Sequence, residues 1–306
     1  MEEKKSISID QFVLRIIAII TMTLDHIGIF LLNYPLESWQ HYTGEVFRLV
    51  GRIAFPLFAL MLAEGMRHSR NKEKYLLRIF SIYALITIVQ TVINYGFANR
   101  FGSLNFPNPF TDLLLNGLTL YFLTKKKYWK FFALIPAAIV CIGYGCDITE
   151  SLYSRTVLWF PVLYRSSYSI YGLLITLGFY YSVPIARAIT RYQKQSLNID
   201  ENTSLLTEKM ERRLINIISC LIFFAINVIF YCIKFYPEIG PKLDVLAMSG
   251  YLYHMGGFQS YAILAIIPIF LYNGKRGYNS KAFRIISYLY FPVHLIIIFL
   301  IFNYAI

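Results

Sequence analysis

Ionisable side chains interrupt the first two apolar runs of the sequence. Asp25 and His26 lie within residues 12–33, and Arg48 and Arg52 follow in the next run, four residues apart. An aspartate inside a membrane costs roughly 2.5 to 3.5 kcal/mol on insertion scales, so it needs a partner or a function. Counted at about 1.5 Å per residue, Asp25 and Arg52 lie at similar depths, about 8 to 10 Å below the outer membrane face. We therefore predict that these two side chains form an ion pair.

His26 is a candidate general base. Neighbouring residues on a helix point about 100° apart, so Asp25 is poorly placed to orient the ring of His26. The ring is then available to take a proton from an attacking amine or hydroxyl. Arg52 and Arg48 would stabilise the oxyanion that forms when the amine or hydroxyl attacks a carbonyl group. The alternative is a satisfied core histidine beside a structural ion pair.

A further histidine, His294, follows Pro292 in the last apolar run, about 15 Å from the inner face. The proline frees backbone groups, and His294 could serve only to satisfy them. The alternative is that His294 continues a polar trail across the membrane. We count it as the fifth candidate catalytic residue, with Asp25, His26, Arg48 and Arg52.

A dense basic turn ends the second apolar run, directly after Glu64-Gly65. The tendency of cytoplasmic segments to be basic explains much of this composition. A functional interpretation is a cradle for the phosphates of an anionic cytosolic donor such as coenzyme A. The candidate donor-binding residues are Glu64, Arg67, His68, Arg70, Lys72, Lys74 and Arg78.

The remaining polar residues predict less chemistry. Asp112 and Asp147 are interpreted as interfacial carboxylates, His41 as an outer-loop residue, and His254 as a weak candidate at the outer mouth of a span. No metal-ligand spacing, phosphate-binding loop or nucleophile elbow occurs, which disfavours a metal site, ATP-driven pumping and serine hydrolysis. The cysteines are interpreted as packing residues: Cys141, Cys146, Cys220 and Cys232.

These residues must be positioned by membrane helices. Apolar residues make up 57% of the chain, charged residues 15%, and the mean hydropathy is +0.52. Such a composition excludes a soluble domain and predicts an all-α, polytopic transmembrane bundle. Residues 110–124 make a short span, and residues 156–165 are a candidate re-entrant segment. About nine spans fit: 12–33, 47–66, 75–97, 110–124, 131–147, 166–186, 213–234, 257–273 and 285–304.

Charge placement predicts the orientation. With the N-terminus in the cytoplasm, 22 of the 29 Lys and Arg residues fall on the cytoplasmic side, and an odd number of spans puts the C-terminus outside. The net charge of +12 then reflects topology, and no nucleic-acid partner is expected. We predict one integral domain over residues 1–306 in the cell membrane, with an uncleaved first span and a polar cytoplasmic linker at 187–213.

Three stretches resemble the TraX family, named for a protein that acetylates the N-terminus of F-type pilin. They are Leu14–Gly28, Val50–Ile79 and Tyr288–Leu295. The second begins VGRIAFPLFALMLAEG, which is similar to the family's Gly-Arg-aliphatic-Ala-Phe-Pro-x-Phe-Ala signature followed by Glu-Gly. Two departures are Ser69, where Thr is expected, and Ile170, where an acidic residue is common.

The resemblance implies a membrane acetyltransferase that uses acetyl-coenzyme A as donor. Its acceptor would be an amine or hydroxyl on a surface or exported peptide, glycan or lipid. A rival hypothesis is a transporter or flippase for a charged surface-glycan or lipid precursor, and a third is a membrane scaffold. The positions that match the family motifs are Asp25, His26, Gly51, Arg52, Glu64, Gly65 and His294.

Overall fold

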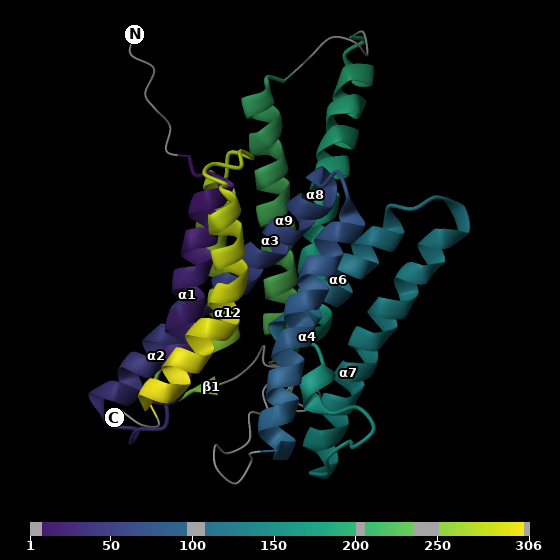
Figure 1. Ribbon diagram of the computed structural model, residues 1–306. Coiled ribbons are helices and arrows are strands. Elements are labelled where there is room, and N and C mark those ends of the chain that lie inside the picture. The colour runs from purple at the N-terminus through teal and green to yellow at the C-terminus, as the bar shows by residue number, and fades with distance from the viewer. Residues whose placement is uncertain (1–7, 97–107, 200–205, 235–250, 303–306) are drawn as a thin grey trace.

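The computed structural model describes residues 8–96, 108–199, 206–234 and 251–302. Over these residues the chain is an all-α membrane bundle of long helices (Figure 1), with one short hairpin of two-residue strands. The elements are α1 (Gln11–Leu31), α2 (Trp39–Gly51), α3 (Ala54–His68), α4 (Lys72–Gly96), α6 (Pro109–Leu123), η1 (Lys127–Ala133), α7 (Leu134–Tyr153), η2 (Val162–Tyr164), α8 (Ser169–Ser196), α9 (Glu208–Lys234), β1 (Tyr251–Leu252), β2 (Gly256–Gly257), η3 (Phe258–Ala265), α11 (Ile266–Leu271) and α12 (Lys281–Leu300).

Seven helical segments of the described residues are long and apolar enough to cross a membrane. The fourth and eighth predicted spans correspond to shorter elements, α6 with 15 residues and the apolar stretch Gln259–Leu271. The count of nine spans and the orientation therefore stay predictions. Residues 154–161 form no helix, so the re-entrant assignment of 156–165 also stays a prediction.

The second predicted span is divided in two by a break at Arg52–Ile53, between α2 and α3. Pro56 explains the position of the break. A proline has no N–H to donate to the carbonyl four residues earlier, which belongs to Arg52, and its ring clashes with that carbonyl. The amides of Arg52 and Ile53 instead donate to the carbonyls of Leu49 and Val50, three residues back, at 3.2 Å. Arg52 therefore sits at a tight turn inside the bundle.

Close helix packing joins α2 to α1. A Cβ atom added to Gly28 would lie 2.8 Å from the carbonyl oxygen of Gly44, and one added to Gly51 would lie 2.5 Å from Oδ1 of Asp25. Both distances are too short for real side-chain contacts. The glycines therefore allow the two helix backbones to approach each other, and Gly51 in particular leaves room for the Asp25 carboxylate.

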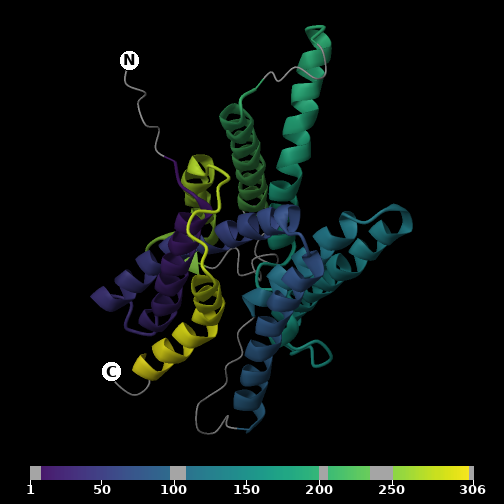
Figure 2. The same cartoon turned by 45° about the horizontal axis from the view of Figure 1, so that its top comes forward.

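The helix α12 returns from the end of the chain to lie beside α1 in both views (Figures 1 and 2). A backbone bridge ties the chain start to the loop before α12, because the Ile9 amide donates to the Leu271 carbonyl at 3.0 Å and the Asn273 amide donates to the Ile9 carbonyl at 2.8 Å. At the centre of the bundle, α3 is buried along most of its length. The helices α1, α3 and α12 thus bring the two terminal regions of the sequence together.

The polar stretch at 187–213 is more helical than the sequence pattern indicates. The helix α8 continues to Ser196, and α9 begins at Glu208. The Arg, Gln, Lys and Ala residues at the start of this stretch have good helix propensity, so α8 continues beyond the apolar run. Between the two helices, Nε of Arg187 lies 3.9 Å from Oε1 of Glu211.

Candidate functional site

The predicted ion pair between Asp25 and Arg52 is confirmed. Nη2 of Arg52 donates to Oδ1 of Asp25, and Nη1 of Arg48 donates to Oδ2 at 2.7 Å. Both arginines come from the end of α2, so one carboxylate is shared by two guanidinium groups across the α1–α2 contact. All three side chains are largely buried. We name Asp25, Arg48 and Arg52 the charge cluster.

The donors of Arg52 are directed at partners on three segments. In addition to Asp25, its Nη1 donates to Oε1 of Gln259 at 3.3 Å and its Nε donates to the carbonyl of Arg48 at 3.3 Å. Arg52 thereby connects α1, the α2–α3 turn and η3. This arrangement favours a positioning role for Arg52, and the oxyanion role stays a prediction.

His26 and His294 contact each other, although 268 residues separate them. Nδ1 of His26 lies 2.8 Å from Nε2 of His294, and Nδ1 of His294 lies 2.8 Å from the carbonyl oxygen of Tyr290. A carbonyl oxygen only accepts, so in the neutral rings we assign the proton of His294 to Nδ1 and that of His26 to its Nδ1. The Nε2 atom of His26 then carries a lone pair. This is the protonation state that a general base requires.

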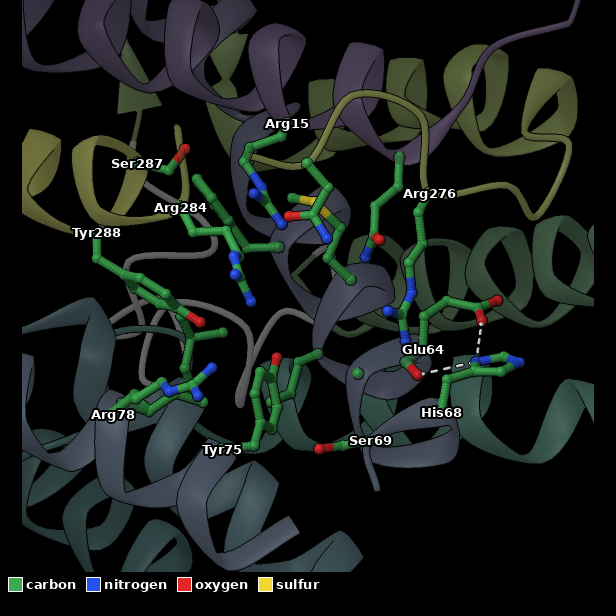
Figure 3. A pocket seen from close by; sticks show the side chains of 18 of the residues that line it. Arg15, Glu64, His68, Ser69, Tyr75, Arg78, Arg276, Arg284, Ser287 and Tyr288 are labelled. Carbon is green, nitrogen blue, oxygen red and sulfur yellow. Dashed lines mark hydrogen bonds and ion pairs between the residues drawn. The ribbon is translucent and has the colours of Figure 1, made fainter. Parts of the chain in front are cut away.

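A cavity of about 510 Å³ opens at the end of the bundle that holds the basic turn. Six Lys and Arg side chains line it, against a single carboxylate among the described lining residues, Glu64. Figure 3 shows Arg15 from α1 and Arg284 from α12 directed toward the same space, with Arg78 from α4 across it. The surroundings of this space suit an anionic ligand with several negative charges. We name it the basic cavity.

The candidate donor-binding residues divide into two groups. Glu64, His68, Arg70, Lys74 and Arg78 line the basic cavity, whereas Arg67 and Lys72 are not among its lining residues.

Arg67 is turned toward the bundle interior. It donates to Oε1 of Glu64 at 3.1 Å and to the carbonyls of Phe179 and Tyr180 at 3.2 and 3.3 Å. Arg212 of α9 donates to the same Glu64 oxygen at 2.8 Å. Glu64 is therefore neutralised within the protein and adds little repulsion toward an anion.

The sequence analysis missed the cavity residues that lie far from the basic turn. These are Arg15 at the start of α1, Arg276 before α12, and Arg284 and Tyr288 in its first turns. The basic residues had been counted only as evidence of topology. Nothing local in the sequence indicates that they surround one space, since this depends on α1 and α12 lying side by side.

One face of α1 connects the basic cavity to the histidines. Arg15, Ile19 and Met22 line the cavity, and His26 follows Met22 by four residues, which is about one helical turn. The inner wall includes Phe291, whose ring centroid lies 5.8 Å from that of His26 and 5.5 Å from that of His294. From Arg15 to His26 the helix rises about 16 Å. Phe291 thus contacts both the cavity and the histidine pair.

Of the two aspartates predicted at the interface, Asp112 is buried and Asp147 is half-buried. Asp112 accepts hydrogen bonds from the amides of Ser167 and Tyr168 at 2.7 and 2.9 Å and from the hydroxyl of Ser166. Asp147 pairs with Arg165 at 2.7 Å. Both carboxylates fix the segment before α8, which gives them a structural role apart from the histidine pair.

His41 is not an outer-loop residue, so that prediction is wrong. It lies in α2, which begins eight residues before the predicted span, and it is buried. The sequence analysis used continuous apolarity to place the start of the span. Polar residues pack against one another here instead. Glu45 lies one helical turn after His41, and it contacts His254 of the β1–β2 hairpin, the weak candidate of the sequence analysis. Among the described residues, no group of His, Cys, Asp and Glu side chains has the arrangement of a metal site.

Comparison with known proteins gives two matches. A family model described as TraX protein matches residues 10–220. The probable fimbrial assembly protein FimC, serogroup H1, of Dichelobacter nodosus is 43% identical over 75 residues, which cover 24% of this chain and 29% of that protein. The similarity therefore spans less than a third of this curated relative. No solved structure matches the chain.

Proposed function

Because the chain belongs to the TraX family, we propose that it is an acetyltransferase of the cell membrane that serves the assembly of pili or fimbriae. The donor is cytosolic acetyl-coenzyme A, and the acceptor is an amine or hydroxyl on an exported or surface molecule. The name of the relative, a probable fimbrial assembly protein, supports the link to surface fibres. The proposed transferase activity is supported by the geometry of the basic cavity and the histidine pair.

One observation carries the proposal: the basic cavity is lined by six cationic side chains and also by Phe291, whose ring contacts both His26 and His294. The phosphates of the donor would bind at Arg15, Arg78 and Arg284, where the guanidinium groups offer paired donors. The long arm of the donor would follow the face of α1 toward His26. An anion site next to a base is what acyl transfer from a charged thioester donor requires.

His26 would act as the base and His294 as its support. In the proposed step, the acceptor nitrogen or oxygen bonds to the acetyl carbonyl carbon, and Nε2 of His26 takes the proton from the acceptor. The carbon–sulfur bond then breaks, and the thiolate of coenzyme A leaves and takes up the proton that His26 received, which restores the neutral ring. The Tyr290 carbonyl holds the proton of His294 on Nδ1, and the hydrogen bond from His26 to Nε2 of His294 then holds His26 in the required tautomer. The charge cluster would keep α1 and α2 in register around the site.

The test is transfer of labelled acetyl groups by the purified full chain in lipid nanodiscs, from acetyl-coenzyme A to envelope fractions. We expect His26→Ala to lower the rate by about 10²- to 10⁴-fold, the usual contribution of a general base. Binding of acetyl-coenzyme A and the unfolding temperature should stay near the wild-type values, because the cavity residues are unchanged.

Three results would contradict the proposal or the role of His26. Folded protein that binds acetyl-coenzyme A but labels no fraction, and instead moves a lipid or glycan precursor across the bilayer unchanged, would identify a transporter. Full surface-fibre assembly by the His26→Ala variant would indicate a scaffold. A rate unchanged by His26→Ala would remove His26 as the base.

A further inference from the structure

A second polar cluster lies at the end of the bundle opposite the basic cavity, between α2 and the β1–β2 hairpin. Its centre is Glu45, whose side chain has no exposed surface. Glu45 accepts hydrogen bonds from the backbone amide of His254 at 2.9 and 3.1 Å and faces Nδ1 of the same residue at 3.1 Å. A buried carboxylate thus holds both the backbone and the ring of His254.

The geometry fixes which nitrogen of His254 faces outward. A carboxylate only accepts hydrogen bonds, so the proton of the His254 ring is assigned to Nδ1, and Nε2 carries the lone pair. The side chain is 36% exposed, unlike that of His294, which is buried. A carboxylate that orients one imidazole nitrogen and leaves the other free is the arrangement of a proton-accepting dyad.

Aromatic rings flank the exposed imidazole. The ring centroids of Tyr253 and Tyr42 lie 4.8 and 5.9 Å from that of His254, and both tyrosines are exposed. His41, in contrast, is buried. Its Nδ1 lies 3.1 Å from the carbonyl of Tyr34, and its Nε2 lies 3.7 Å from Oε1 of Glu45, which is beyond hydrogen-bond distance. Nε2 of His254 is therefore the exposed acceptor of the cluster, and it lies beside the rings of Tyr42 and Tyr253.

The cluster lies on the same face of α2 as the charge cluster. His41, Glu45, Arg48 and Arg52 follow at spacings of four, three and four residues, which place them along one side of the helix. Glu45 is about 10 Å from Arg52 along the helix axis. In the predicted orientation His254 faces the outside, where an acceptor arrives.

We propose that Glu45 and His254, with Tyr42 and Tyr253, form the docking site for the acceptor of the transfer reaction. The ligand is a group that donates an N–H or O–H hydrogen bond to Nε2 of His254, carried on a part that packs against the two tyrosine rings. An ammonium group gains further from the buried Glu45 charge and from the ring faces. This inference rests on the proposed function for the role of the ligand, but the site itself is tested without the donor.

The experiment uses the full chain in proteoliposomes and modification of histidines by diethyl pyrocarbonate, with the sites identified by mass spectrometry. Reagent applied from the side of the β1–β2 hairpin should modify His254 rapidly and His26, His41 and His294 slowly. Tyramine and tyrosol are the probes, since they share one ring and carry an ammonium or a hydroxyl group. At ten times its Kd, a bound probe should slow modification of His254 about tenfold.

Protection by tyramine alone supports the site and identifies an ammonium ligand, whereas protection by both probes supports it and identifies hydrogen bonding as sufficient. Glu45→Gln keeps the side-chain shape but removes the charge, and it should weaken tyramine protection. The matched control is Glu37→Gln, at an exposed position in the same end of the bundle, which should leave protection unchanged. Protection by neither probe, or tyramine protection in Glu45→Gln equal to that in the wild type, would overturn the proposal.

Kinetics separate this inference from the proposed function. His254→Gln should raise the KM for the acceptor and leave the KM for acetyl-coenzyme A unchanged, which a merely structural hairpin contact would not do. Transfer that depends on His26 but not on His254 refutes only the docking site. Protection of His254 in a protein that transfers no acetyl group refutes only the transferase.

Discussion

Arginine has two different roles at the two depths of this bundle. In the charge cluster, Arg48 and Arg52 share one carboxylate across a tight helix contact, and the carboxylate lies beside a glycine that leaves it room. In the basic cavity, Arg15, Arg78 and Arg284 surround open space and form no ion pair with a carboxylate among the described residues. The first arrangement is complete without a ligand, and the second is arranged to receive one.

The contrast shows how to separate structural from ligand-binding arginines. A buried guanidinium whose N–H groups donate to protein acceptors holds helices together. Removal of either partner of such an ion pair leaves the other partner's charge buried and uncompensated. A guanidinium that faces a cavity contributes little to folding and much to affinity. Substitutions at the two sites should therefore change different measurements.

The largest effect is expected from Asp25→Leu. The substitution leaves two buried guanidinium groups without a counter-charge, which costs about 3 to 5 kcal/mol when a buried pair is broken from one side. Unfolding of the purified protein by heat or denaturant should show this loss. Adding Arg52→Met should restore part of the stability, because one of the stranded charges is then removed. Wild-type stability in Asp25→Leu would refute the distinction between the two regions.

A smaller effect is expected from Gly51→Ala. The new methyl group would lie 2.5 Å from Oδ1 of Asp25, and relieving such overpacking costs about 1 to 3 kcal/mol. The matched control is Gly145→Ala in α7, where an added Cβ meets nothing within 4 Å. That variant should be unchanged or more stable. Equal unfolding temperatures for both variants would argue against the close contact of α1 with α2.

In the basic cavity, Arg78→Ala and Arg284→Ala should each weaken binding of acetyl-coenzyme A about tenfold, which equals about 1.4 kcal/mol. Stability should change by less than about 0.5 kcal/mol, as for other substitutions away from packed contacts. Arg191→Ala, at an exposed position of α8 outside the cavity, is the control and should bind normally. Titration calorimetry in nanodiscs measures the affinities. Unfolding of the cavity variants would show that these arginines are structural.

The smallest effect is the response to salt. Raising the ionic strength should weaken donor binding steadily, because the cavity opens to solvent and its charges are screened. The unfolding temperature should change much less, since the charge cluster is buried and poorly screened. Measuring both quantities over the same salt series tests the comparison without any substitution. A donor affinity independent of salt would speak against recognition of phosphates.

The sequence predicted those features that depend on local geometry. Because helix rise is constant, counting residues matched the depths of Asp25 and Arg52 and predicted their pair, which the structure confirms. The break before Ala54 was also visible in principle, since Pro56 cannot bond to the carbonyl of Arg52. We predicted one continuous span because its apolar composition outweighed this signal.

Features that depend on which helices are neighbours could not be predicted. The contact of His26 with His294 and the gathering of Arg15 and Arg284 around one cavity require α1 to lie beside α12. Hydropathy identifies spans but does not determine their neighbours. His41 was misplaced for a related reason, because its burial depends on polar partners that a single helix pattern does not contain.

The pairing of Asp25 with Arg52 has a consequence for biosynthesis. The two residues are 27 positions apart, so both are translated before most of the bundle exists. Each charge alone costs roughly 2.5 to 3.5 kcal/mol at the centre of a newly inserted helix. As an antiparallel hairpin, α1 and α2 bring the opposite charges together during insertion. The first two helices can thus leave the translocon as a unit that neutralises its own Asp25, without waiting for any later helix.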